Sequence, residues 1–384
     1  MKKINYPHNE DFKSNYYELL KNDFNEEKIN EILKKIESSW NFEKLLTANF
    51  IELLEISNIE DFEKKVIDEL NSIFFDKKKD RIIYHYEVKQ PKISKFIMDN
   101  DIDMKTCHYC NIDFINTIEE QLKFSSLNQF YLEAPYEVLM LIPGIKKNEA
   151  EEIINKRVYN KKIDWLKERF PKFYRWSFNK INSKTTSSID KLDLKNITIK
   201  KNHFTLDHIL PKNKFPFLSL SLFNLVPSCY SCNSKFKNQR EFTINKELEK
   251  ISPTSDKFEL NELIKFKMRF DICDNKFEEK IKKIKEIKDV IIEIENKDNL
   301  YTVDEFIEIF KLRPRYEFHK EISFKMIKKR KIYSDSQIKE IAQLLKRDEQ
   351  SIKEDLFGKE CFESNNEPFE KYKQDIAKQL GIIK

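Results

Sequence analysis

Two Cys-x-x-Cys pairs and an Asp-His pair are the residues of this 384-residue chain whose types and spacing could support chemistry. The cysteine pairs are Cys107 with Cys110 and Cys229 with Cys232. Four thiolates bind zinc tetrahedrally, and this spacing lets both sulfurs of a pair reach one ion. Loop closure costs grow only logarithmically with length, so the long separation of the pairs is tolerated. We expect one structural zinc; the alternative is two unrelated pairs of buried thiols.

One histidine and two further cysteines could be either metal ligands or core residues. His108 lies inside the first pair and could replace a cysteine, but with four thiolates present we expect it to point to solvent. Cys273 and Cys361 stand alone, and we expect both in the hydrophobic core.

The Asp-His pair belongs to the segment FTLDHILPKNKFPFLSLSLFNLVPSCYSCNSK, which begins at Phe204. Asp207 and His208 are followed by Asn224, and Asn233 comes directly after the second cysteine pair. This arrangement resembles the HNH nuclease family, whose fold is the ββα-metal finger, and also the HNH domains of RNA-guided CRISPR nucleases. The resemblance implies two strands and a helix, held together by the cysteine pairs.

Phosphodiester hydrolysis explains these residue types, because it needs an activated water and a cation at the phosphate. A neutral imidazole accepts a proton near neutral pH, so His208 is the predicted general base. Asp207 and the amide oxygen of Asn233 are the predicted ligands of a catalytic Mg²⁺ or Mn²⁺. Many family members have a histidine in place of Asn233, and asparagine favours magnesium or manganese over zinc. The resemblance implies that Asn224 ties the loop between the strands and helps to orient His208.

Each of these residues also has an ordinary explanation when it is taken alone. Asp207 would cap a turn, His208 would be a hydrogen-bonded core histidine, and Asn233 would cap a helix. Their joint occurrence beside a thiolate pair favours the catalytic interpretation.

Four lysines are candidate contacts for nucleic acid. Lys235 and Lys237 follow the last predicted ligand and are expected to neutralise phosphates. Residues 138–157, VLMLIPGIKKNEAEEIINKR, resemble a helix-hairpin-helix, a motif whose backbone N–H groups bind a DNA phosphate. Lys146 replaces its usual second glycine, and Lys146 and Lys147 are the predicted phosphate contacts there. The alternative is a simple helix N-terminus packed on the finger.

Composition excludes several other classes of protein. No run of eighteen apolar residues is present, which predicts no membrane helix. The N-terminus has no apolar core typical of a secretory signal, so we expect a cytoplasmic protein. Only three glycines occur, which excludes a Gly-rich phosphate loop. A net charge of +5 is too small to establish a nucleic-acid partner by itself.

Hydrophobic periodicity predicts a mainly helical α+β fold. The resemblance to the HNH family implies an embedded ββα-metal finger. Helical patterns cover about 15–75, 127–182 and 241 to the end, the last with a break at KLRPRYEF (311–318). The alternating stretch 81–88 predicts a strand or an extended link, and 182–194 a flexible loop. The predicted parts are an N-terminal helical region, a first zinc knuckle, a helical insertion, the HNH core and a C-terminal helical region, covering 1–95, 96–126, 127–195, 196–243 and 244–384.

We therefore predict an HNH endonuclease that cuts DNA, and we expect double-stranded DNA as its substrate. The predicted cofactors are a structural zinc ion and a separate catalytic Mg²⁺ or Mn²⁺. The C-terminal third also resembles segments that follow HNH cores in bacterial anti-phage nucleases, such as the Septu-type partner of an ATPase. That resemblance implies a role in defence or restriction, with an ATPase or another regulatory protein as partner. Two alternatives stay open: an RNA-cutting toxin, and a zinc-dependent nucleic-acid-binding module without catalysis.

Overall fold

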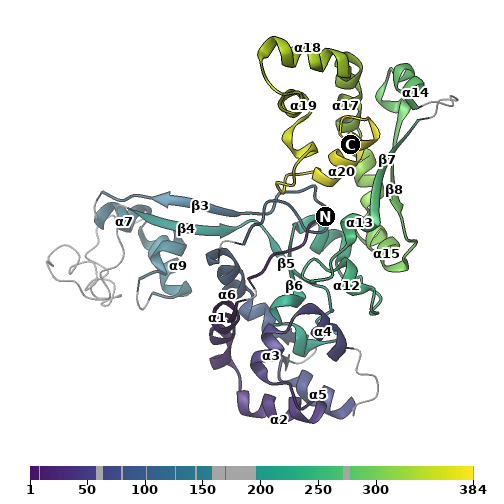
Figure 1. Cartoon of the computed structure of the whole chain (residues 1–384). Helices are drawn as coiled ribbons and strands as arrows, with labels where there is room; N and C mark the ends of the chain where they lie inside the picture. Colours follow the sequence, from purple (N-terminus) through teal and green to yellow (C-terminus); the bar gives the residue numbers. More distant parts are fainter. Residues whose placement is uncertain are drawn as a thin grey trace. The chain divides into compact units, whose positions relative to one another are not determined.

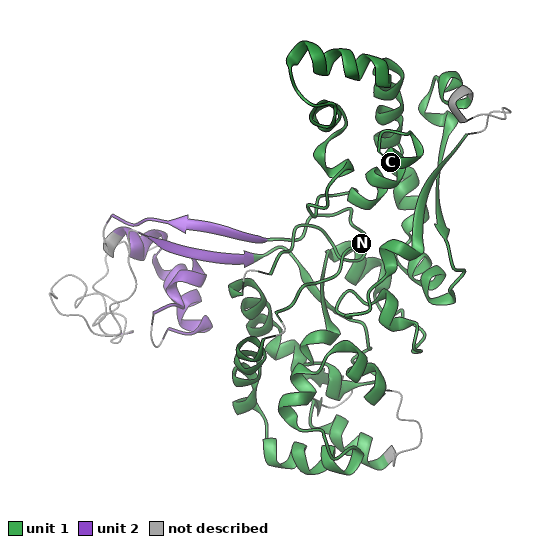
Figure 2. Cartoon of the chain, in the orientation of Figure 1, with its two compact units in different colours: residues 1–116, 202–384 green, residues 117–201 purple. Residues whose placement is uncertain are grey.

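The computed structural model describes residues 1–7, 9–57, 64–78, 81–100, 102–125, 127–142, 145–157, 169, 196–270 and 277–383. They form two compact units (Figure 2), the first made of Met1–Asn116 with Asn202–Lys384 and the second of Thr117–Lys201. Helices dominate the elements, and the strands occur as small pairs (Figure 1). The predicted mainly helical α+β class is confirmed.

The N-terminal part of the first unit is a group of short helices. Asn9, Asn25 and Asn41 each accept a hydrogen bond from the backbone N–H three residues later, and so begin the first three helices. The helical pattern predicted for this region is thus confirmed over its described residues. The helices are α1 (Glu10–Leu20), α2 (Glu26–Ile36), α3 (Phe42–Thr47), α4 (Phe50–Ser57) and α5 (Lys64–Ser72).

A small hairpin and a long helix follow. Strands β1 (Phe75–Lys78) and β2 (Arg81–Tyr84) pair antiparallel, and the hydrogen bond from the backbone N–H of His85 to the carbonyl of Phe74 closes the pair. Helix α6 begins at that point and spans His85–Asp99. The predicted strand over 81–88 is therefore half as long as expected, because its second half is the first turn of a helix.

The central element is a ββα arrangement. Strands β5 (Thr205–His208) and β6 (Leu225–Ser228) pair antiparallel, and a π-helix, η5 (Ser231–Lys237), follows. Each strand has only one neighbour, which is why Pro227 is tolerated within β6. The loop between the strands contains two short 3₁₀ turns, η3 (Pro216–Leu218) and η4 (Leu222–Asn224).

Three buried tyrosines from the N-terminal part hold this finger in place. The hydroxyls of Tyr6, Tyr16 and Tyr86 donate hydrogen bonds to backbone carbonyls of the finger, at distances of 3.1, 2.7 and 3.3 Å. The accepting residues are Leu225, Leu220 and Leu206. Buried carbonyls of the finger's loop and strands thereby find partners, and the finger is fixed to the N-terminal helices.

The C-terminal part contains a hairpin that the sequence analysis missed. Strands β7 (Ile264–Phe270) and β8 (Val290–Asn296) pair antiparallel along their whole length, so the helical prediction is wrong here. Apolar residues alternate along β8, and those facing the core follow the period of two that defines a strand. Side chains of neighbouring helices satisfy edge N–H groups: Asp375 accepts from Phe266 at 2.9 Å and Glu317 from Ile292 at 2.7 Å.

Helices make up the rest of this part. The predicted break at 311–318 falls instead at Lys311, which has a φ of 51°, and Leu312–Phe318 is itself helical because Pro314 lies in its first turn. The helices are α12 (Leu248–Ile251), α13 (Leu260–Leu263), α14 (Phe277–Lys283), α15 (Tyr301–Ile309), α16 (Leu312–Phe318), α17 (Glu321–Ile332), α18 (Asp335–Leu345), α19 (Glu349–Phe357) and α20 (Glu370–Gln379).

The described residues of the second unit form a strand pair and three helices around a core of their own. Its elements are β3 (Thr117–Leu122), α7 (Leu127–Glu133), α8 (Tyr136–Leu139), α9 (Lys147–Arg157) and β4 (Ile197–Asn202). The predicted loop over 182–194, the Pro143-Gly144 pair of the helix-hairpin-helix resemblance, and Cys273 lie outside the described residues. Among the helices that are described, none is long and apolar enough to cross a membrane.

Candidate active site and metal centre

The four cysteines of the two pairs come together in the first unit. Their sulfur atoms all lie within 4.8 Å of one another, and all four residues are buried. Tetrahedral zinc with Zn–S bonds of about 2.3 Å places sulfurs about 3.8 Å apart, so this cluster fits the ion. The cluster can thus hold a metal, and zinc is the ion that four thiolates favour.

Backbone and side-chain donors surround these sulfurs. Backbone N–H groups lie 3.3 Å from Cys107 Sγ, 3.4 Å from Cys110 Sγ and 3.3 Å from Cys229 Sγ. Arg315, on helix α16, lies with Nη1 at 3.3 Å from Cys232 Sγ. Burial first, and then the neighbouring cysteines, raise the pKa of Cys232, because thiolates packed this closely repel one another. A divalent cation removes that repulsion, which supports a metal at this position.

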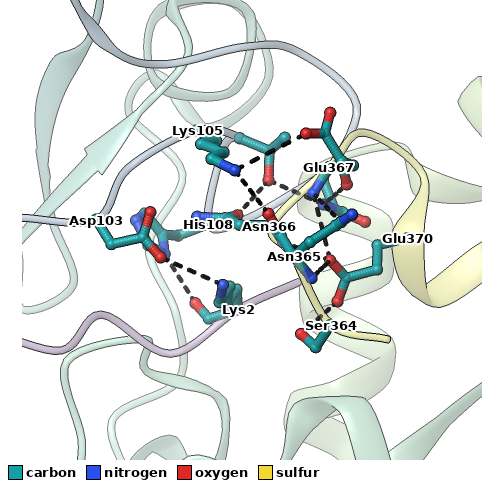
Figure 3. A network of polar contacts seen from close by, with 11 residues as sticks. Lys2, Asp103, Lys105, His108, Ser364, Asn365, Asn366, Glu367 and Glu370 are labelled. Atoms are coloured by element: carbon teal, nitrogen blue, oxygen red, sulfur yellow. Dashed lines mark hydrogen bonds and ion pairs between the residues drawn. The ribbon is translucent and has the colours of Figure 1, made fainter. Parts of the chain in front are cut away.

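The C-terminal segment braces the first knuckle from outside (Figure 3). Thr106 Oγ1 donates to Asn366 Oδ1 at 2.8 Å, and Lys105 Nζ donates to the carbonyl of Asn365 at 3.1 Å. His108 is fully buried, with Nδ1 2.9 Å from the carbonyl of Lys2, so the expectation that it points to solvent is wrong. Burial lowers the pKa of His108 to about 4, and the neutral ring serves as a packing residue.

Asp207 is buried at the end of β5, and both of its oxygens have partners. Oδ2 accepts a hydrogen bond from the hydroxyl of Tyr109 at 2.7 Å, and Oδ1 lies 3.0 Å from the ammonium of Lys237. Burial, and next the Asp207 carboxylate, hold the pKa of Tyr109 well above its usual range, so the phenol keeps its proton and donates. Tyr109 lies between Cys107 and Cys110, and therefore connects the first knuckle directly to the carboxylate.

His208 is 7% exposed. Its ring contacts the ring of Tyr86 edge-on, with the two ring centroids 4.4 Å apart. Its Nε2 lies 2.9 Å from the carbonyl of Ser219. A carbonyl only accepts, so Nε2 carries the proton and Nδ1 carries the lone pair of the neutral ring. Burial lowers the pKa of His208 to about 3, which keeps the ring neutral at physiological pH. Within the described part of the chain Nδ1 has no hydrogen-bond partner, so its lone pair is free; the same burial makes the ring a weaker base than a free imidazole.

Asn224 ties the loop of the finger to the strand. Its side-chain oxygen accepts from the N–H of Leu210 at 2.7 Å, and its amide nitrogen donates to the carbonyls of Leu210 and Leu218, each at 3.0 Å. These bonds hold both sides of the loop that carries Ser219, the partner of His208. Asn224 itself is fully buried, and its role in orienting His208 stays a prediction.

Asn233 lies in the π-helix and donates from Nδ2 to the carbonyl of Leu206 at 3.2 Å. This bond orients the amide and leaves Oδ1 available as a ligand. Asp207, His208 and Asn233 line one cavity of about 640 Å³. A carboxylate and an amide oxygen beside open space fit a hard ion such as Mg²⁺ or Mn²⁺, which keeps several waters.

The four predicted phosphate-binding lysines have different surroundings. Lys235 is exposed on the π-helix, as a phosphate contact requires. Lys237 is only 4% exposed and pairs with Asp207 inside the cavity wall, and its contact with phosphate stays a prediction. Lys146 and Lys147 lie in the second unit, at the start of α9, and their role stays a prediction.

Sequence reasoning missed several residues of this site. The position of Tyr109 within a predicted zinc knuckle places it near the metal site. Nothing in the sequence indicates that it contacts Asp207. Arg315 is separated from the cysteine it contacts by 83 positions, and only the folded chain brings them together. Lys212 and Arg240 also line the cavity and add positive charge to it.

An antiparallel strand pair followed by a helix, with Asp-His on the first strand and a thiolate cluster, defines a ββα-metal finger. Residues 194–239 match the family model described as HNH endonuclease, so the chain carries an HNH endonuclease domain and the predicted family is confirmed. Neither a curated protein nor a solved structure matches the chain. The similarity to Septu-type nucleases stays a prediction.

Proposed function

We propose that this protein is a metal-dependent endonuclease that hydrolyses phosphodiester bonds of DNA. One observation carries the proposal: a neutral histidine with a free Nδ1, a carboxylate and an amide oxygen line the same cavity in an HNH domain. A site that only bound nucleic acid would have no use for a buried proton acceptor beside such ligands.

His208 is the proposed general base. Its Nδ1 accepts the proton of a water molecule, and the bond from Nε2 to Ser219 fixes the ring while the proton moves. Asp207 and Asn233 would hold a divalent ion, which when bound stabilises the charge that develops on the phosphate and the leaving oxygen. Lys212 and Arg240, on the same cavity, attract the phosphates of the strand. Tyr109 and Asn224 act as positioning residues.

A substrate panel tests this proposal. Zinc-loaded protein is incubated with supercoiled plasmid, linear double-stranded DNA and tRNA, each with Mg²⁺, Mn²⁺ or EDTA. We expect nicking of the plasmid with either metal and none in EDTA, because EDTA removes the divalent ion that Asp207 and Asn233 would hold. Cleavage of tRNA alone would replace DNA by RNA as substrate. Binding of all three without cleavage would show a nucleic-acid-binding module.

The proposed biological role is antiviral defence or restriction, with an ATPase as partner. The resemblance of the C-terminal third to segments of anti-phage nucleases supports this role, and the composition supports a cytoplasmic location. The HNH domain supports only the coarser statement that the substrate is a nucleic acid.

A further inference from the structure

The ion pair between Lys237 and Asp207 occupies the position where a catalytic cation is needed. Lys237 Nζ lies 3.0 Å from Asp207 Oδ1 and 2.6 Å from the carbonyl of His208. The two side chains are 5% and 7% exposed. The lysine therefore neutralises the carboxylate inside the protein, next to the backbone of the proposed general base.

Such a pair has a clear reason to exist when no metal is present. A buried carboxylate without a partner is strongly destabilising, and a lysine that also bonds a carbonyl removes that cost. Tyr109 holds the other oxygen as a neutral donor. Each oxygen of Asp207 thus has one partner within the protein.

The same pair opposes a metal at Asp207. An ammonium and a divalent cation that share one carboxylate lie a few ångströms apart, and at that distance like charges repel strongly in a buried site. Lysine has a compact charge on a flexible four-carbon stem, so its head group can move while its backbone stays in place. Lys237 is the last residue of the π-helix, and it lines the same open cavity as Asn233.

We propose that Lys237 and the catalytic divalent ion are alternative partners of Asp207. In the metal-free protein the ammonium neutralises the carboxylate; when the ion binds, the ammonium leaves Asp207 and turns into the cavity, toward the phosphate of a bound strand. The inference rests on the proposed function, and it makes lysine displacement a step of metal binding.

Manganese binding without nucleic acid tests this exchange. The affinity of zinc-loaded protein for Mn²⁺ is measured by electron paramagnetic resonance for the wild type, Lys237→Gln and Lys237→Met. Removal of the competing charge is expected to tighten Mn²⁺ binding by about tenfold or more. Asp207→Asn is expected to lose the site, which identifies the signal. Lys235→Gln is the matched control on the same helix and should bind Mn²⁺ as the wild type does.

The glutamine variant guards against misfolding, because its amide still donates to the carboxylate. Its zinc content should equal that of the wild type, and Mn²⁺ should raise its melting temperature by more than that of the wild type. Equal or weaker Mn²⁺ binding in both Lys237 variants would overturn the exchange and leave Lys237 as a fixed positioning residue.

The outcome is separate from that of the nuclease proposal. Tighter Mn²⁺ binding in the variants, in a protein that cuts none of the nucleic acids tested, would support the exchange and refute the nuclease. Nicking by the wild type, with unchanged Mn²⁺ affinity in the Lys237 variants, would support the nuclease and refute the exchange.

Discussion

Replacement of His208 by alanine is expected to lower the rate of plasmid nicking by about 10²–10⁴-fold, the usual contribution of a general base. The variant keeps every zinc ligand, so its zinc content should equal that of the wild type. The measurement is the conversion of supercoiled to nicked plasmid, with zinc measured on the same preparation.

Two further variants separate catalysis from folding. His203→Ala removes an exposed histidine five positions away, whose ring contacts only Asn116 in the described chain, and should cut at the wild-type rate. His208→Asn keeps a donor for the carbonyl of Ser219 and should remain as inactive as the alanine variant. A His208→Ala variant that is folded and cuts as fast as the wild type would remove His208 as the base.

Replacement of Cys229 by serine is expected to release the zinc and to destabilise the protein by several kcal/mol, because binding of structural zinc contributes directly to folding. A loss of that size lowers the melting temperature of a chain this long by about 5 °C. Nicking should fall with zinc content, since Tyr109 in the first knuckle holds Asp207. Elemental analysis and thermal unfolding of one preparation provide both measurements.

Cys361→Ser is the matched control for this prediction. Cys361 is also fully buried, but its thiol donates to the carbonyl of Phe357 and lies outside the metal cluster, and serine can make the same bond. This variant should keep its zinc. Wild-type protein without zinc, or Cys229→Ser with full zinc and unchanged melting temperature, would contradict the account of the cluster.

The metal cluster was predictable because its information is local. The spacing of each Cys-x-x-Cys pair predicts two ligands of one ion. That the two pairs bind the same ion is visible only in the folded chain. The same holds for Asp207, His208 and Asn233, whose spacing within a short segment resembles a known finger. The lone Cys361 was correctly expected in the core, whereas Cys273 is not among the described residues.

The partners of these residues were not predictable, because they depend on contacts between distant parts of the chain. Tyr109 reaches Asp207 across 98 positions. Lys237 follows the last predicted ligand, and nothing in the local sequence shows that it pairs with the Asp207 carboxylate. His108 is buried, and its ring lies against the carbonyl of Lys2 in the N-terminal segment. The residues around His108 in the sequence do not predict this contact.

The missed hairpin of β7 and β8 has a different cause. Lysine and glutamate dominate the segment before Val290, and such charged runs are typical of solvated helix faces. The alternation that defines β8 is short and includes the exposed Ile291, which makes the apolar run look continuous. An alternation of period two over so few residues is weak evidence for a strand, and the longer helical pattern around it therefore favoured a helix.

A manganese titration of the nicking rate tests most directly the central claim, that His208 removes a proton while Asp207 and Asn233 hold the ion. For Asn233→Ala, high Mn²⁺ should restore part of the rate, because Asp207, phosphate and water remain as ligands. Asp207→Ala loses the anionic one of the two proposed ligands and should recover little. His208→Ala should not respond to metal at any concentration, since proton removal is missing. Rescue of His208→Ala by manganese, with none for Asn233→Ala, would contradict this division of roles.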